Sequence, residues 1–119
     1  MELLEIIVLL GKNTFEIREE IKQDIEKVGD RFRTKRGYTL ACKSEILKPQ
    51  VHMDDFDCIQ TRKPCIARKI YCLPKDKDKA IRLLKDAIIN RADELIQGAM
   101  FLQNSIIGKT IIEEYLTNQ

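Results

Sequence analysis

The last third of the chain carries apolar residues at the spacing of a single long helix. They recur at steps of three and four residues: Ile81, Leu84, Ile88, Ala92, Leu95, Ala99, Leu102 and Ile106. Such steps place the side chains along one stripe of an α-helix. A helix over residues 78–107 is about 45 Å long, whereas a compact domain of this length has a radius of gyration of about 13 Å. We therefore expect something beyond the chain's own fold to cover the far end of this helix.

A second set of apolar residues lies on the flanks of the same predicted helix. It consists of Leu83, Ala87, Ile89, Ile96, Met100 and Ile107. A helix that is apolar on two sides is buried on two sides, one against the sheet and the other against a second copy or a target protein. We predict self-association, most simply as a two-fold dimer, with Gly98 and Ala99 permitting close approach of the backbones. The residues expected at this contact are Leu95, Ile96, Ala99, Met100, Leu102 and Ile107.

The length and the local patterns predict one α+β domain that comprises residues 1–119. A nearly continuous apolar run predicts a buried strand over residues 1–10. Asn13 followed by Glu16 resembles a capping box, and apolar residues at helical spacing predict a helix over residues 13–29. Alternating patterns predict strands over residues 38–46, 56–61 and 65–73, and helices follow over residues 78–107 and 111–116. The expected order is β-α-β-β-β-α-α, with an N-terminal helix and a long C-terminal helix packed on a small antiparallel sheet.

Several features bear on the location of the protein. The longest uncharged apolar run, from Ile6 to Leu10, is far shorter than the ~20 residues that span a bilayer. Glu2 and Glu5 stand where a secretory leader would be basic. We therefore expect a cytoplasmic protein that does not enter membranes, with its four cysteines as free thiols.

No motif in the chain indicates catalysis or a cofactor. The cysteines form no C-x-x-C pair, and His52 is the only histidine, so we expect no metal site. Three carboxylates crowd around Phe56, and we interpret them as a solvated acidic turn that can also form ion pairs with basic residues, within the chain or across a dimer. Cys65 has Arg62 and Lys63 nearby, which would lower the pKa of an exposed thiol, but nothing else in the local sequence marks it as a nucleophile. We expect a binding protein rather than an enzyme.

Positive charge is concentrated in the middle of the chain. Residues 31–79 hold 13 basic and 6 acidic side chains, whereas residues 1–30 hold 4 basic and 8 acidic ones. If the connector at residues 31–36 and the start of the strand at residues 65–73 share one edge of the sheet, these cations form one basic face for a nucleotide or a nucleic acid. The predicted ligand-binding residues are Arg31, Arg33, Arg36, Tyr38, Arg62, Lys63, Arg68, Lys69 and Tyr71. The tyrosines among them would stack on a base.

The competing hypothesis is a protein-interaction module, such as an inhibitor or accessory factor of a virus or mobile element. In that hypothesis the apolar helix surface around Ile96, Met100 and Ile107 binds a target protein instead of a second copy. Ionic strength separates the two hypotheses, because phosphate binding weakens steeply with salt and an apolar interface does not.

Overall fold

The computed structural model of the protein describes residues 1–107 and 110–118, with side chains for residues 1–104 and 113–118. Two compact units make up the chain, Met1–Ala87 and Ile88–Gln119. The first unit holds two antiparallel sheets and the first turns of helix α2 (Lys77–Ile107). The second unit holds the rest of α2 and helix α3 (Thr110–Thr117). The α+β class predicted from the sequence is confirmed.

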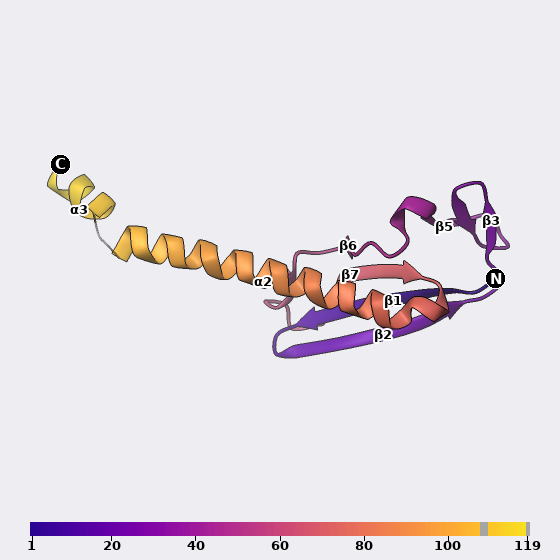
Figure 1. Cartoon of the computed structure of the whole chain (residues 1–119). Coiled ribbons are helices and arrows are strands. Elements are labelled where there is room, and N and C mark those ends of the chain that lie inside the picture. Colours follow the sequence, from indigo (N-terminus) through magenta and orange to yellow (C-terminus); the bar gives the residue numbers. More distant parts are fainter. Residues whose placement is uncertain (108–109, 119) are drawn as a thin grey trace. The chain divides into compact units, whose positions relative to one another are not determined.

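The larger sheet has four strands in the order β2–β1–β7–β6 (Figure 1). Its members are β1 (Leu3–Gly11), β2 (Thr14–Lys22), β6 (Gln50–Val51) and β7 (Cys65–Cys72). β1 pairs antiparallel with β2 on one side and with β7 on the other, and most of its side chains are buried. The continuous apolar run therefore marks a central strand covered on both faces, as predicted.

The predicted helix over residues 13–29 is wrong, because most of this segment forms β2 and the first strand of the smaller sheet. Asn13 adopts a positive φ of 62° in the two-residue turn that joins β1 to β2, so it is a turn residue and not a helix cap. All nine residues of β1 pair with β2, from Leu3 opposite Lys22 to Gly11 opposite Thr14. The apolar residues Phe15, Ile17 and Ile21 fit a strand as well as a helix, and this long pairing decides between the two.

The smaller sheet has three short strands in the order β3–β4–β5. They are β3 (Glu26–Val28), β4 (Arg31–Arg33) and β5 (Thr39–Cys42). A strand was predicted over residues 38–46, but β5 covers only its first part, because a 3-10 turn, Lys43–Glu45, follows β5 directly. The side chains that join the two sheets form one buried cluster: Leu3, Ile25, Phe32, Ala41 and Tyr71.

The strand predicted over residues 56–61 is also wrong, because a short helix, α1 (Asp55–Cys58), stands at its start. The carboxylate of Asp54 accepts a hydrogen bond from the Phe56 N–H at 3.0 Å and caps this helix. The strand predicted over residues 65–73 is confirmed as β7. In a regular strand Ile66 and Ile70 would share a face, because they are four residues apart. A register shift opposite Val8 and Leu9 places Ile66 on the other face.

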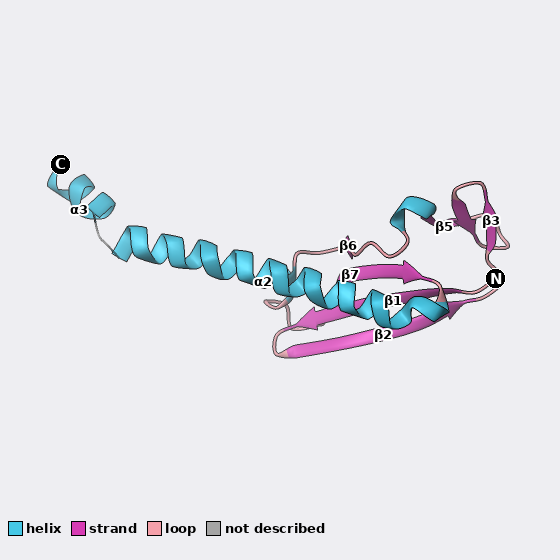
Figure 2. Ribbon diagram, viewed as in Figure 1, coloured by secondary structure: helices cyan, strands magenta, loops and turns pink. Residues whose placement is uncertain are grey.

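The long helix predicted over residues 78–107 is confirmed as α2, and the short helix over residues 111–116 as α3 (Figure 2). Ala80 and Leu84 of α2 are fully buried in the first unit. Lys77 Nζ lies 2.8 Å from Glu19 Oε2, so the start of α2 is tied to the face of the larger sheet on which Glu19 stands. On that face β2 places Phe15, Ile17 and Ile21 beside the buried side chains of β1.

Candidate functional site

Four of the predicted ligand-binding residues, Arg31, Arg33, Arg36 and Tyr38, lie together on the smaller sheet, and we call them the hairpin cluster. Phe32 between the first two is buried, so Arg31 and Arg33 lie on the outer face of β4. The turn that follows is closed by a hydrogen bond from the Thr34 N–H to the Tyr38 carbonyl at 2.8 Å. Gly37 sits in this turn with a φ of 87°, a conformation that favours glycine. The Tyr38 side chain is left 69% exposed.

The charges around the hairpin cluster are only partly compensated. Glu26 stands opposite Arg33 in the β3–β4 register, and Lys35 pairs with Asp24 at 3.6 Å. Among the described residues, Arg33 Nε is buried and has no hydrogen-bond partner. A buried donor without an acceptor costs free energy, and an anion that accepts from it would remove that cost.

Arg62 and Lys63 form a second basic group, the loop cluster, between α1 and β7. Both side chains are exposed. Their loop is held to the β1–β2 turn by a hydrogen bond from the Lys12 N–H to the Thr61 carbonyl at 2.7 Å. The Thr61 hydroxyl lies 2.7 Å from the Cys58 carbonyl oxygen and 2.8 Å from that of Lys63, which fixes the loop's shape.

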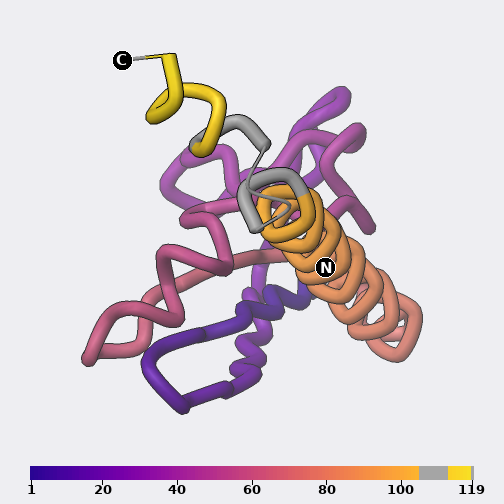
Figure 3. Tube along the Cα trace, turned by 90° about the vertical axis from the view of Figure 1, so that its left-hand side faces the viewer, coloured from indigo at the N-terminus to yellow at the C-terminus, as the bar shows by residue number. Residues whose placement is uncertain are grey.

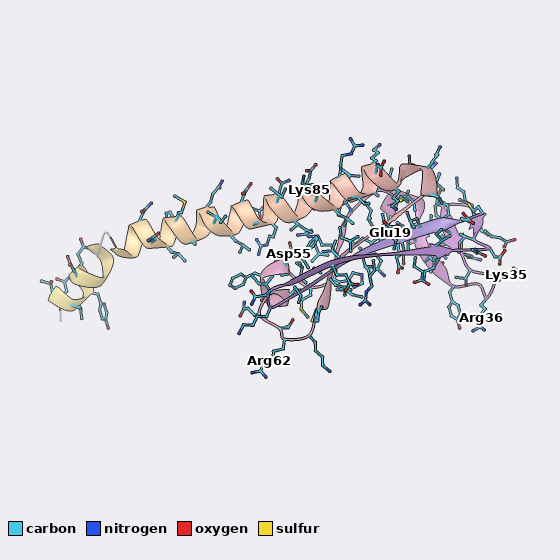
Figure 4. The ribbon with its side chains drawn as sticks, turned by 90° about the horizontal axis from the view of Figure 1, so that it is seen from below. Glu19, Lys35, Arg36, Asp55, Arg62 and Lys85 are labelled. Atoms are coloured by element: carbon cyan, nitrogen blue, oxygen red, sulfur yellow. The ribbon has the colours of Figure 1, made fainter. Side chains whose placement is uncertain are left out.

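The structure does not bring the hairpin cluster and the loop cluster together. The smaller sheet adjoins the start of β1, where the Ile25 N–H bonds to the Met1 carbonyl, whereas the loop cluster adjoins its end. β1 has nine residues, about 30 Å at ~3.4 Å per residue. Figure 4 shows Arg36 and Arg62 at opposite ends of the strands. The single basic face expected from the sequence is therefore not formed, because β7 runs antiparallel to β1 and so begins at the far end.

Arg68 of the predicted set is buried and holds an internal partner. Its Nη2 lies 3.0 Å from Asp55 Oδ2, and its Nε lies 3.2 Å from the same oxygen. The two side chains are only 9% and 11% exposed. The sequence indicated that the acidic turn could form ion pairs with basic residues, within the chain or across a dimer. The contact between Asp55 and Arg68 is such an ion pair within the chain.

Lys69 and Tyr71 also have internal partners, and both meet Glu5. The Tyr71 hydroxyl donates to Glu5 Oε2 at 2.7 Å, and Lys69 Nζ lies 3.8 Å from the same atom. Lys69 Nζ also stands 5.4 Å from the centre of the Tyr71 ring. Burial raises the pKa of the Tyr71 hydroxyl, and the hydrogen bond to Glu5 raises it further. Tyr71 is 4% exposed, so it packs in the core and offers no free ring for stacking.

Glu5, the partner of both Lys69 and Tyr71, was not identified from the sequence. It is the one charged residue within the apolar run of β1, and such a residue signals a partner across the sheet. Tyr71 stands opposite it in the β1–β7 register. The pair could have been found from the strand pattern once β7 was aligned antiparallel to β1.

The cysteines of the described structure are free, and three of them have thiols that resist ionisation. Burial raises the pKa of Cys58 and that of Cys72. A hydrogen bond with Glu45, together with burial, raises the pKa of Cys42. Within residues whose side chains are described, no three His, Cys, Asp or Glu side chains gather as they would to hold a metal ion.

The second half of α2 presents the predicted association residues to solvent. Leu95 is half-buried and Ala99 is exposed, while Ile96, Met100 and Leu102 are between 54% and 56% exposed. The side chain of Ile107 lies outside the described residues. Phe101, which the sequence reasoning left out, is 70% exposed. A Cβ built on Gly98 would meet nothing within 4 Å, so a neighbouring backbone has room to approach.

A charge-free segment underlies this exposed surface. Residues 95–108 contain no Asp, Glu, Lys or Arg, although a long solvent-facing helix usually carries several. The last charged pair before the segment is Arg91 and Glu94, whose Nη1 and Oε2 atoms are 3.2 Å apart. This run of uncharged residues was visible in the sequence and is the signal that identifies Phe101 as well.

None of the described helices has the length and apolar character needed to cross a membrane. Comparison of the chain with protein-family models, with curated proteins and with solved structures finds no match. The functional argument therefore depends on the surfaces described above.

Proposed function

We propose that the protein is a non-catalytic interaction protein that self-associates through the second half of α2. The contact surface consists of Leu95, Ile96, Ala99, Met100, Leu102 and Ile107, and Phe101 lies outside it on the helix. The observation that carries this proposal is the exposure of large apolar side chains along a helix segment without charge. Full burial of a Leu, Ile or Met side chain contributes about 1.5–3 kcal/mol, and this gain favours a contact that buries several of them, against the cost of association.

The geometry of an α-helix supports one continuous contact band. At about 100° per residue, Leu95, Ala99 and Leu102 share one stripe, and Ile96 and Met100 form the adjacent stripe. Gln97 and Asn104 lie on the other side of the helix. A second copy packed on this band would bury both stripes at once, with Ala99 close to the crossing point.

A charge-insertion experiment tests the proposal. The Ile96→Asp/Met100→Asp variant places two carboxylates in the band, and the Gln97→Asp/Asn104→Asp variant places the same charge outside it. We expect the first variant to sediment at a lower mass than the wild type and the second to keep the wild-type mass at the same concentration. Equal masses for both variants and the wild type would contradict self-association through this band.

The same measurement distinguishes self-association from the alternative function of this surface, which is to bind a target protein such as a host or viral factor. A wild-type chain that is monomeric at 0.5 mM, a concentration of the order at which weak dimers form, would favour that reading over self-association. We place either activity in the cytoplasm, because all four cysteines are free.

A second candidate function is binding of a phosphate-bearing ligand, a nucleotide or a nucleic acid, by the hairpin cluster. Arg33 Nε, buried and without an acceptor among the described residues, supports it, as do the exposed side chains of Arg31, Arg36 and Tyr38. The loop cluster is a separate basic site about 30 Å away and serves as the internal control. Fluorescence anisotropy with a labelled single-stranded oligonucleotide should show tight binding at low salt that the Arg31→Ala/Arg36→Ala variant loses and the Arg62→Ala/Lys63→Ala variant retains. Equal loss in both variants would indicate unspecific charge attraction.

A further inference from the structure

The outer edge of β2 is open along its whole length. β2 is the terminal strand of the four-stranded sheet, and in the described part of the chain no other strand pairs with this edge. Figures 1 and 3 show no other described segment running along it. Proteins usually shorten, twist or cover such an edge, because its free N–H and C=O groups bind other strands. A straight open edge nine residues long is therefore a candidate for pairing.

The two faces of β2 differ in chemistry. On the face shared with the start of α2, Phe15, Ile17 and Ile21 are between 39% and 61% exposed. The opposite face carries charges of alternating sign at every second residue: Glu16, Arg18, Glu20 and Lys22. Each acidic residue pairs with the next basic one within the strand, at 2.9 Å in both cases. The strand is thus apolar on one face and alternately charged on the other.

We propose that β2 pairs with β2 of a second copy, antiparallel about a two-fold axis at Glu19. In this register Arg18 stands opposite Glu20 of the second copy, and Glu16 stands opposite Lys22. The two-fold axis repeats each contact, so the four charged pairs on this face have opposite signs. On the other face Ile17 stands opposite Ile21, which covers apolar side chains that the single chain leaves exposed.

The direction of the backbone groups agrees with this register. Lys12 and Asn13 form a two-residue turn, so Gly11 and Thr14 are the pair that closes it with hydrogen bonds. Hydrogen-bonded pairs alternate along an antiparallel ladder, so the odd-numbered residues of β2 direct their N–H and C=O groups to the open edge. A two-fold axis at Glu19 makes those odd-numbered residues bond to one another. Arg18 and Glu20 then form a non-hydrogen-bonded pair, in which side chains come closest.

Shifting the strands by two residues removes the complementarity. An axis at Arg18 would put this arginine against its own copy and Glu16 against Glu20, so every charged contact would be between like charges. An axis at Ile17 keeps only the contacts between Glu16 and Arg18. At the proposed axis Glu19 does meet Glu19 of the second copy, but each of these carboxylates already has Lys77 Nζ at 2.8 Å.

This edge lies in the unit Met1–Ala87, so the inference is independent of association through the second half of α2. The test therefore uses the full chain carrying Ile96→Asp/Met100→Asp, in which helix association is removed. In this background we expect sedimentation to show a concentration-dependent dimer. A chain that stays monomeric up to 0.5 mM, a range in which weak interfaces are populated, overturns the proposal and leaves helix association untouched.

Charge reversal then tests the register. Arg18→Glu alone and Glu20→Arg alone each create two like-charge contacts, and we expect each to weaken dimerisation at least about tenfold. An equimolar mixture of the two variants restores four opposite-sign contacts, so it should dimerise within about threefold of the parent. A mixture no tighter than the single variants overturns the proposed register.

A cross-link provides a test that does not depend on charge. Glu19→Cys places two thiols on the axis with their Cα atoms about 5.5 Å apart, within disulfide range. Glu16→Cys is the matched control, because its copies are six residues out of register, about 20 Å apart. Rapid oxidation to a covalent dimer by Glu19→Cys and not by Glu16→Cys supports the pairing, and equal rates for the two variants contradict it.

Discussion

The buried ion pair between Arg68 and Asp55 supports a quantitative prediction for the Asp55→Ala variant. The Asp55 carboxylate accepts hydrogen bonds from two guanidinium nitrogens at distances between 3.0 and 3.3 Å. Its removal leaves a guanidinium that is 9% exposed without a counter-charge. Stranding one partner of a buried pair costs about 3–5 kcal/mol. This is a large share of the ~5–15 kcal/mol that stabilises a typical domain.

Urea unfolding followed by circular dichroism measures this loss. We expect the free energy of unfolding of Asp55→Ala to fall by about 3 kcal/mol or more and its Tm to fall by at least about 12 °C. The exposed pair between Lys35 and Asp24, 3.6 Å long, is the control, and Lys35→Ala should leave the urea midpoint unchanged within error. The contrast isolates the effect of burial from that of the ionic contact itself.

A double variant tests whether the stranded charge is the cause. Arg68→Met/Asp55→Ala removes both charges and keeps an apolar side chain in place of the arginine, so it should regain a large part of the lost stability. If the double variant is no more stable than Asp55→Ala, the loss arises from packing. The reasoning is refuted if Asp55→Ala unfolds at the wild-type urea concentration.

Two further predictions concern the larger sheet. The pKa of the Tyr71 hydroxyl is raised, so the folded state holds this proton more tightly than the unfolded state. The resulting stabilisation is fully present below the unfolded pKa of about 10 and is lost as the pH rises above that value. Unfolding measured between pH 8 and pH 11, either side of that ordinary tyrosine pKa, should show this decline in the wild type and a shallower one in Tyr71→Phe; equal slopes would contradict it. A Cβ on Gly11 would lie 2.6 Å from Thr14 Oγ1 and 3.1 Å from the Pro64 Cα, so Gly11→Ala should cost about 1–3 kcal/mol of unfolding free energy. A Gly11→Ala variant with the wild-type Tm would contradict this prediction and would show that the loop at Pro64 moves aside without loss of stability.

The elements predicted correctly are those that local pattern alone specifies. α2 has a long apolar stripe at helical spacing, β1 is an apolar run that ends at turn residues, and β7 has an alternating pattern between two prolines. β2 was missed because Ile17, Ile21 and Ile25 recur every four residues, while the competing alternation of Phe15 and Ile17 gains its weight only from pairing with β1. Strand formation of this kind depends on a neighbour that a local window does not contain.

Some features of the candidate site also follow from the local sequence pattern, whereas others depend on the topology of the fold. Exposure of Ile96 and Met100 follows from the local pattern, because a helix with too much apolar surface leaves part of it uncovered. The separation of Arg36 from Arg62 depends on the direction of β7 relative to β1, which is a property of the topology. The burial of Arg68 likewise depends on where α1 folds, and no spacing rule connects it to Asp55.

The continuity of α2 has a consequence for how the association surface forms. Starting a helix is unfavourable, with a nucleation constant of about 10⁻³, whereas extending one is nearly neutral and takes about a nanosecond per residue. The first turns of α2, anchored by the buried Ala80 and Leu84, supply that nucleus, and the residues beyond Ala87 only extend it. We therefore expect residues 95–107 of a chain whose sheet is still unfolded to lack the helical stripe on which the proposed self-association depends.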